Sequence, residues 1–397
     1  MRRITILLAV VALVAAACDG GATDTTASTA PEATEPTEAP ATGVQALADA
    51  CVLGETDGDL NLYNWTGYIP TGSLAEESEV KDLVVGFEEE FGVNVTVTEY
   101  DSNEVMLTQI DAGVGYDVVV PSDYMVDQMR FANLLVKLNH AAIPNLANID
   151  DLFADPPYDP GNQFSVPYQW GTTGIGYLYG SIDDEDGVSW GVIFDPDLSA
   201  PNTGYISLLN DERETLGSAL KYLGYSLNTK NPDEVDEAAA LIRATKDRLA
   251  AFNSSAYWTL LTTGETRVAH GWNGDFLAEY DRISTDEYDA YDDFGYAIPV
   301  EGSAAWVDTM AIPTTAQHPC TAQTFLNYIL DAENGAELTN YNYYASPNAA
   351  SAEFIYPEIL EDPSIYPPPE TMDILEFFQD LGEFNTYYAD AFSDAKG

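Results

Sequence analysis

The pattern of apolar and polar positions after residue 60 predicts an α/β chain. Short runs rich in β-branched and aromatic residues indicate strands at "LNLYNW" (60–65), "VNVTVTEY" (93–100) and "YDVVVPS" (116–122). Helical spacing lies between them at "LVVGFEEEFG" (83–92) and "DSNEVMLTQIDAG" (101–113). Asp101 followed by Glu104 predicts a capping box at the start of the second helix. Strands that alternate with helices in this way predict an open, doubly wound sheet.

A second alternating stretch runs from "TTGIGYLYG" (172–180) to Pro299. It predicts a strand turning into a helix at 205–228, a long amphipathic helix at 233–252, and a strand, a Trp-Asn-Gly turn and a helix at 266–280. Beyond it, "SAAWVDTMAIP" (303–313) predicts a strand, and "AQTFLNYILDAENGAEL" (322–338) predicts one helix. The folded part therefore contains two successive α/β segments.

Large side chains follow two of the predicted strands where those strands end. Trp65 and Tyr68 come after the first strand, and Ser122 and Tyr124 come after a later one. Open α/β sheets bind ligands in the crevice outside the carboxyl ends of their strands. We therefore expect both pairs at a ligand-binding edge, the alternative being that they pack beneath loops.

The N-terminal segment is read as a targeting signal. "MRRITILLAVVALVAAAC" (1–18) has a basic start, an apolar run and small residues before Cys18, as in a secretory signal. Its Ala-Ala-Ala-Cys ending resembles a bacterial lipobox, which would make Cys18 the lipidated first residue. A plain signal peptide or a single membrane anchor is the alternative, although the run is short for a span of about 20 residues. Residues 19–56 are predicted to be a disordered tether, because the part before Val44 lacks large apolar residues.

Charge excludes several classes of partner. The 397 residues contain 66 Asp plus Glu against 14 Lys plus Arg, a formal net charge of −52. Such a chain repels nucleic acids and anionic lipids and attracts cations. The charge fits adaptation to salt or simple solubility as well as it fits a cationic ligand.

The chain has 3 cysteines. With Cys18 lipidated, Cys51 and Cys320 remain, and an exported chain with two cysteines favours a disulfide over two buried thiols.

Several motifs together resemble the substrate-binding proteins of polyamine ABC transporters, the spermidine/putrescine-binding family. The resemblance covers the chain from about residue 57 onward. It rests on the order and spacing of "YNWT" with Tyr68, "YDSNEVM" (100–106), "YDVVVPSDYMVDQM" (116–129), "VPYQWGTTGIGY" (166–177), "NDERETL" (210–216), "GWNGDF" (271–276), "WVDTMAIP" (306–313) and "SPN" (346–348).

The resemblance implies a bilobal periplasmic-binding-protein fold of type II, with two doubly wound open sheets joined by hinge crossovers. Lobe one would comprise residues 57–174 and 307–350, and lobe two residues 175–306 and 351–397. Such proteins close on their ligand by hinge bending. The implied protein is a monomer that delivers a polyamine to ABC permease subunits. It would need no cofactor and no metal, and only a lipid anchor would attach it to the outer face of the cytoplasmic membrane.

The resemblance also implies a set of ligand-binding residues. A polyamine is a flexible apolar rod with ammonium groups at intervals, and each buried charge needs an acceptor. Asp308 would supply one toward one end, and Asp211 and Glu214 toward the other. Without the family match, the last two would be read as charges that favour a helix N-terminus. Aromatic walls and neutral hydrogen-bonding groups would come from Trp65, Tyr68, Tyr124, Trp272, Trp306, Tyr344, Ser122 and Gln379.

The remaining tryptophans, Trp170, Trp190 and Trp258, are assigned to core or hinge packing. Two departures from the family pattern stand out. Asp275 replaces a residue that is usually small and neutral or aromatic, and it would either accept another amine or face solvent. "NYYASPN" replaces the usual Gly-Tyr-Pro-Thr-Pro-Asn around Tyr344.

Two other functions fit parts of the sequence. A glycoside hydrolase needs two carboxylates with a defined separation and split pKa values, and no such pair stands out. A ferric-ion-binding protein of similar architecture would use adjacent tyrosines such as Tyr343 and Tyr344. His140, His270 and His318 are the 3 histidines, and none lies in a catalytic motif. The sequence therefore predicts a binding protein and not an enzyme.

Overall fold

The computed structural model describes residues 43–183 and 187–397. The predicted signal peptide with Cys18 and the predicted tether as far as residue 42 lie outside the described residues. The strands are β1 (Leu60–Trp65), β2 (Val95–Tyr100), β3 (Val118–Val119), β4 (Ser165–Leu178), β5 (Ile206–Leu208), β6 (Leu249–Phe252), β7 (Val268–Trp272), β8 (Phe294–Ala297), β9 (Ala304–Ala311) and β10 (Glu376–Phe377).

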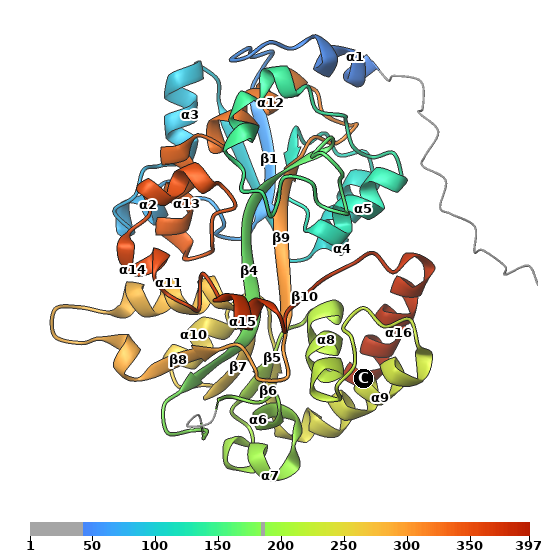
Figure 1. The fold of residues 1–397 in the computed structure, drawn as a ribbon, viewed down its shortest axis with the longest axis vertical. Coiled ribbons are helices and arrows are strands. Elements are labelled where there is room, and N and C mark those ends of the chain that lie inside the picture. The colour runs from blue at the N-terminus through green and yellow to red at the C-terminus, as the bar shows by residue number, and fades with distance from the viewer. Residues whose placement is uncertain (1–42, 184–186) are drawn as a thin grey trace, which may run out of the picture. The chain divides into compact units, whose positions relative to one another are not determined.

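Helices connect and cover these strands (Figure 1). They are α1 (Gly43–Ala50), α2 (Ser73–Glu77), α3 (Leu83–Phe91), α4 (Asn103–Asp111), α5 (Asp123–Phe131), α6 (Gly191–Phe194), α7 (Pro196–Ser199), α8 (Glu212–Tyr222), α9 (Pro232–Thr245), α10 (Tyr257–Thr262), α11 (Asn273–Ile283), α12 (Pro319–Ile329), α13 (Ala332–Asn342), α14 (Pro357–Leu360), α15 (Pro369–Met372) and α16 (Asn385–Lys396). Among these residues no helix combines the length and the apolar character needed to cross a bilayer.

Two parallel groups of strands are joined by two antiparallel strands. The order is β2-β1-β3-β9-β4-β7-β5-β6, with β8 added to β4 and β10 added to β9. β1 pairs in parallel with β2 and β3, and β5 pairs in parallel with β6 and β7. Parallel strands whose neighbours in the sheet are linked through helices are the doubly wound arrangement that the alternating sequence predicts.

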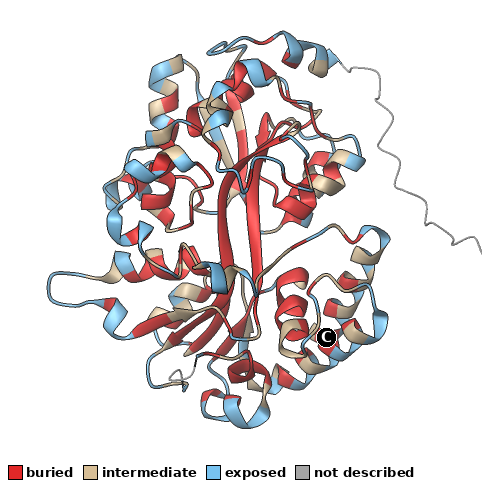
Figure 2. Ribbon diagram, viewed as in Figure 1, coloured by how far each residue is buried: buried red, intermediate tan, exposed pale blue. Residues whose placement is uncertain are grey.

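β4 and β9 connect the two groups. The first half of β4 pairs with β9, and its second half pairs with β7 and β8 (Figure 1). Every residue of β9 is buried, and so is every residue of β4 except Leu178 (Figure 2). The predicted lobe boundaries near residues 174 and 306 fall inside these two strands and stay predictions. We call the group around β1 the first half and the group around β5 the second half.

The folded body begins earlier than the sequence indicated. The predicted disordered tether extended to residue 56, but residues 43–50 form α1, and this part of the prediction is wrong. α1 is short and only Ala48 is buried in it, so its own sequence gives a weak helical signal. Its stability comes from contacts with the rest of the protein. Gln45 and the backbone of Lys137 exchange hydrogen bonds of 2.8 and 3.0 Å, and Gln323 donates to the Ala48 carbonyl.

A disulfide fixes the end of α1. Cys51 and Cys320 are bonded, with 5.2 Å between their Cα atoms, and Cys320 lies in the first turn of α12. Of the two alternatives that the sequence left open for these cysteines, the structure contains the bridge.

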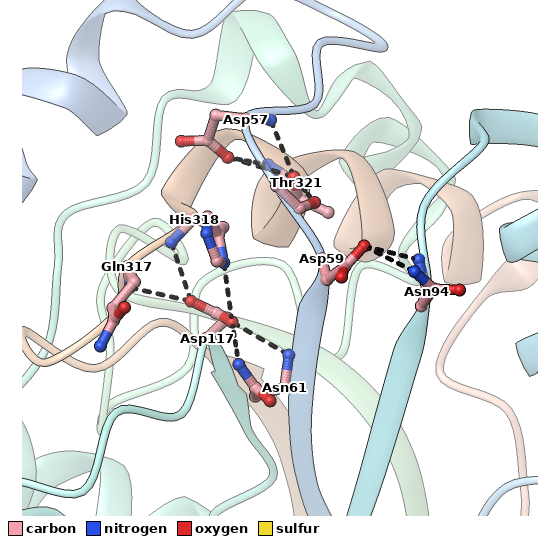
Figure 3. Close-up of polar contacts among 9 residues, drawn as sticks. Asp57, Asp59, Asn61, Asn94, Asp117, Gln317, His318 and Thr321 are labelled. Atoms are coloured by element: carbon pink, nitrogen blue, oxygen red, sulfur yellow. Dashed lines mark hydrogen bonds and ion pairs between the residues drawn. The ribbon is translucent and has the colours of Figure 1, made fainter.

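A buried carboxylate ties together the edge of the first half where β1 and β3 begin. Asp117 is fully buried, and one of its oxygens accepts hydrogen bonds from the backbone and side-chain nitrogens of Asn61 at 2.9 and 3.1 Å. The other accepts from the backbone nitrogens of Gln317 and His318, each at 2.8 Å (Figure 3). Asp57 binds Thr321 beside it in the same way. These contacts hold the start of α12 against β1.

Three local predictions are wrong. The helix expected at 233–252 ends as α9 at Thr245, and Leu249–Phe252 form strand β6, which pairs with β5. The single helix expected at 322–338 is divided into α12 and α13, because the Asp331 side chain accepts from the backbone nitrogens of Glu333 and Asn334 and starts a new helix. α4 is capped by Ser102 and not by Asp101, since the Ser102 hydroxyl accepts from the Val105 nitrogen at 3.2 Å.

Replacing both bridged cysteines, Cys51→Ser with Cys320→Ser, should lower the free energy of unfolding by about 2–4 kcal/mol, because the bond restricts the unfolded chain and holds α1. Urea unfolding would measure this. Reductant should bring the unaltered protein to the stability of the double variant and should leave the variant unchanged. Equal stability of the two proteins without reductant would contradict the prediction.

Candidate functional site

One cavity lies between the two halves at the ends of their strands. We call it the interlobe cavity. It is lined by Trp65, Thr66, Tyr68, Tyr100, Asp101, Asn103, Ser122, Tyr124, Asp211, Arg213, Glu214, Ser254, Ser255, Trp258, Trp272, Asp275, Trp306, Asp308, Tyr344 and Phe378. These residues include five carboxylates, one guanidinium and nine aromatic rings. A wall of this composition attracts cations that also carry apolar surface.

Aromatic rings from both halves meet in this cavity. Trp65 at the end of β1 and Trp272 at the end of β7 lie edge to face, with 6.3 Å between ring centroids. Trp65 is oriented by its indole nitrogen, which donates to the Val120 carbonyl at 2.9 Å. Tyr344 contacts Tyr68 at 5.4 Å and Trp306 at 5.2 Å, both edge to face.

The glycine of the Trp-Asn-Gly turn makes room for this packing. A Cβ atom on Gly274 would lie 2.6 Å from the ring of Tyr344 and 2.6 Å from the carbonyl oxygen of Asn342. Close contact between α11 and the residues after α13 therefore requires glycine at this position.

Asp308 on β9 is the buried acid that the first half contributes to the cavity. It is 6% exposed, and the Ser122 hydroxyl donates to its Oδ1 at 2.6 Å. Ser122 is held by Asn103, which accepts from the Ser122 backbone nitrogen and donates to its hydroxyl. Asn103 also donates to the Tyr124 hydroxyl at 3.1 Å. The sequence missed Asn103, although the amide lies in the "YDSNEVM" motif.

Glu214 on α8 is the buried acid that the second half contributes to the cavity. It is 5% exposed, and its Oε1 accepts from the indole nitrogen of Trp272 at 2.8 Å. Its Oε2 has no hydrogen-bond partner among the described residues. Asp211 has both roles that the sequence proposed, because it lines the cavity and its Oδ1 caps α8 by accepting from the backbone nitrogens of Arg213 and Glu214.

Asp275 lies in the first turn of α11 and lines the same cavity. The Tyr257 hydroxyl donates to its Oδ2 at 2.5 Å. Burial raises the pKa of Asp275 to about 6, although hydrogen bonding from Tyr257 and Tyr344 opposes the shift. Of the two alternatives left open for this residue, the structure favours a place in the site over a place in solvent.

Burial also raises the pKa of the two principal acids. The pKa of Asp308 rises to about 7, and that of Glu214 rises to about 8, with a further contribution from the charge of Asp211. The cause is loss of hydration of the charged form. A cation placed between these groups would favour their charged forms and displace their protons.

Arg213 was not predicted. It is 2% exposed and lies between Asp211 and Glu214 in sequence. Its Nη1 donates to the Gln379 carbonyl at 3.1 Å, and its guanidinium lies 5.0 Å from the ring centroid of Phe378 and 5.4 Å from that of Tyr124. It supplies one fixed positive charge at the acidic end of the cavity.

The structure brings together every predicted ligand-binding residue except Gln379. The Gln379 side chain is exposed, and its backbone bonds to Arg213 and Asn228, while the preceding Phe378 turns inward. Trp258, which was assigned to core or hinge packing, packs against the core and also lines the cavity. Trp170 and Trp190 are buried in the core as expected. A tryptophan on a short helix gave no signal that could separate these roles.

The cavity does not resemble a metal site. Within residues 43–183 and 187–397, no group of three or more His, Cys, Asp or Glu side chains is placed to hold a metal ion. Tyr344 lines the cavity, but the adjacent Tyr343 does not. The neighbouring tyrosines considered for ferric iron are therefore not presented together.

Comparison with known proteins gives consistent matches. Residues 82–367 match the family described as bacterial extracellular solute-binding protein. The spermidine/putrescine-binding periplasmic protein of Escherichia coli is 31% identical over 359 residues, covering 90% of this chain and 97% of the relative. A putrescine/cadaverine-binding protein of Pseudomonas aeruginosa is 35% identical over 326 residues, covering 81% of this chain and 88% of the relative.

Solved structures of similar proteins have the same fold. The structure described as a putative spermidine/putrescine ABC transporter from Listeria monocytogenes superposes with a TM-score of 0.76 at 34% identity, covering 86% of this chain and 99% of that chain. These matches confirm the predicted α/β periplasmic-binding-protein fold and the resemblance drawn from the motifs.

The raised pKa of Glu214 should make the ligand-free protein less stable as pH rises from about 4.5 to about 8. In this interval the folded state binds more protons than the unfolded state, so the stability present at low pH is lost on the way up. Glu214→Gln should reduce this loss by an amount on the order of 3 kcal/mol, and the exposed Glu353→Gln should not. Urea unfolding at several pH values would measure the difference. Parallel pH profiles for the unaltered protein and Glu214→Gln would contradict the prediction.

Proposed function

The chain belongs to the bacterial extracellular solute-binding proteins, and we propose that it captures a polyamine in the interlobe cavity for an ABC transporter. The observation that carries this proposal is the pair of buried acids, Asp308 and Glu214, which come from different halves and line one aromatic cavity. Relatives named as spermidine/putrescine-binding and putrescine/cadaverine-binding proteins support it.

The acids match the charges of such a ligand. Each ammonium of a polyamine needs an acceptor when it leaves water, and a carboxylate is the strongest acceptor available. Asp308 with Asp275 would serve one part of the rod, and Glu214 with Asp211 another. The unpartnered Oε2 of Glu214 would accept a hydrogen bond from an ammonium group, and the Ser122 hydroxyl would keep Asp308 oriented.

The rings match the apolar part of the ligand. Methylene groups between two ammonium charges need apolar walls that tolerate nearby cations. Indole and phenol faces do this, with a gain of about 0.5–2 kcal/mol for a cation over a ring, depending on its desolvation. Trp65, Trp272, Trp306 and Tyr344 would form these walls.

The same arrangement gives a mechanism for closure. A ligand can favour the closed form only through contacts that the open form lacks. Contacts to both Asp308 and Glu214 meet this condition, because β9 and α8 carry these acids on different halves. Bending in β4 and β9, which connect the halves, would accompany closure.

The family supports a proposal for how the protein is attached and where it delivers its ligand. Members are extracellular solute-binding proteins, which places the cavity outside the cytoplasm. Lipidation of Cys18 would hold a monomer near ABC permease subunits at the outer face of the cytoplasmic membrane. The relatives are named as binding proteins, which supports a role in binding without catalysis for this chain.

Asp308→Asn should weaken polyamine binding by about 2–5 kcal/mol, because an ammonium would lose its buried charged partner. Isothermal titration calorimetry with spermidine and putrescine would measure the dissociation constants. The exposed Glu353→Gln removes one carboxylate outside the cavity and should leave binding unchanged. An unaltered dissociation constant for Asp308→Asn would count against the site.

The same calorimeter separates the alternatives. Ferric citrate should give no binding heat, and spermidine or putrescine should give saturable heat. Heat with iron and none with either amine would replace this proposal with the ferric-ion alternative. Release of sugar from an oligosaccharide, abolished in Glu214→Gln, would instead support a glycoside hydrolase.

A further inference from the structure

A polar chamber adjoins the interlobe cavity where loops from the two halves meet. We call it the side chamber. Its volume is about 360 Å³, and it is lined by Asp101, Ser102, Val105, Asn210, Phe252, Asn253, Ser254 and Ser255. Three of these residues, Asp101, Ser254 and Ser255, also line the interlobe cavity. The two spaces therefore lie side by side and share part of their wall.

Asp101 is the only carboxylate that lines the side chamber. Its carboxylate is not used to start α4, because Ser102 caps that helix. No described residue donates a hydrogen bond to it, and the residue is exposed. An acid next to a ligand cavity that is neither capping a helix nor paired is available to a ligand.

The rest of the side chamber is neutral. The Ser254 hydroxyl accepts from the Asn210 backbone nitrogen at 2.9 Å, and Asn253 accepts from the backbone nitrogens of Ser255 and Ala256. Val105 and Phe252 add apolar surface. This combination suits a short run of methylene groups that ends in a charge.

The one cation near this wall stays outside the chamber lining. Lys396 donates to the side-chain oxygen of Asn210, and its ammonium lies 5.8 Å from the ring centroid of Phe252. Lys396 repels a second ammonium from that side. A ligand charge in the chamber is therefore directed to Asp101.

We propose that the side chamber receives the terminal arm of a polyamine longer than a triamine and that Asp101 binds its fourth ammonium. The inference rests on polyamine binding in the interlobe cavity. Asn210 of the side chamber precedes Asp211 of the cavity, so the chamber lies beside the acidic end formed by α8. Spermine exceeds spermidine by one aminopropyl arm, which brings one more charge and three methylene groups.

The contribution of Asp101 is moderate because it is exposed. Paired charges that remain in contact with water contribute up to about 1 kcal/mol, which corresponds to about fivefold in affinity. The protein should therefore bind spermine more tightly than spermidine by about this factor. Asp101 therefore contributes to selectivity for spermine over spermidine. The buried acids contribute to the affinity for any polyamine.

Asp101→Asn tests the inference by calorimetry with spermine and spermidine at constant ionic strength. The variant should bind spermine about fivefold more weakly than the unaltered protein, and its loss of spermidine affinity should be clearly smaller. Asp111→Asn, at the exposed far end of the same helix, removes the same charge outside the chamber and should change neither. It controls for general attraction of spermine to an acidic protein.

Val105→Trp provides a second, steric test. Val105 is exposed and lines the side chamber but not the interlobe cavity. A bulky side chain there should block the arm, so that spermine binds no more tightly than spermidine, while spermidine binding is retained. Thr259→Trp, exposed on α10 and outside both linings, is its control. Equal spermine and spermidine affinities in the unaltered protein, or equal losses of both in Asp101→Asn, would overturn the inference alone. Failure to bind either amine would overturn polyamine binding as well.

Discussion

The arrangement of the site depends on the cost of burying a carboxylate without a cation. Asp308 and Glu214 are almost completely buried, and their hydrogen-bond donors are neutral groups such as the Ser122 hydroxyl and the Trp272 indole. Neutral donors reduce the cost of burial but do not remove it, so both pKa values are raised. A cation in the cavity would therefore stabilise both carboxylates. These carboxylates lie on two halves that are connected by the strands β4 and β9.

Arg213 reduces the negative charge of the cavity. Its guanidinium is fixed by the Gln379 carbonyl and by aromatic rings, so it neutralises part of the acidic end without filling the cavity. One buried arginine among five acidic residues leaves a net negative cavity. The structure thus combines a fixed internal cation with space for a mobile one.

Much of the fold could be predicted from the sequence, because alternating strands and helices leave a periodic apolar pattern. Most of the site could be predicted because its residues follow strand ends within motifs such as "WVD" and "DERE". The predictions failed where tertiary contacts determine whether a helix forms or where a side chain points. α1 depends on a disulfide and on hydrogen bonds to distant residues, and Gln379 differs from expectation only in the direction of its side chain. Asp101 was predicted to cap α4 because Glu104 follows it at capping-box spacing. The neighbouring Ser102 can also cap a helix, and it does so in the structure.

The bridge between Cys51 and Cys320 has a consequence for where the mature fold can be completed. Thiols stay reduced in the bacterial cytosol, and disulfides persist in oxidising surroundings. A copy retained inside the cell would lack the covalent attachment of α1 to α12, and the segment before β1 would be held only by hydrogen bonds and by the apolar packing of Ala48 and Val44. Formation of the Cys51–Cys320 bond would therefore depend on export. Newly made chains would differ from exported chains by the absence of this bond.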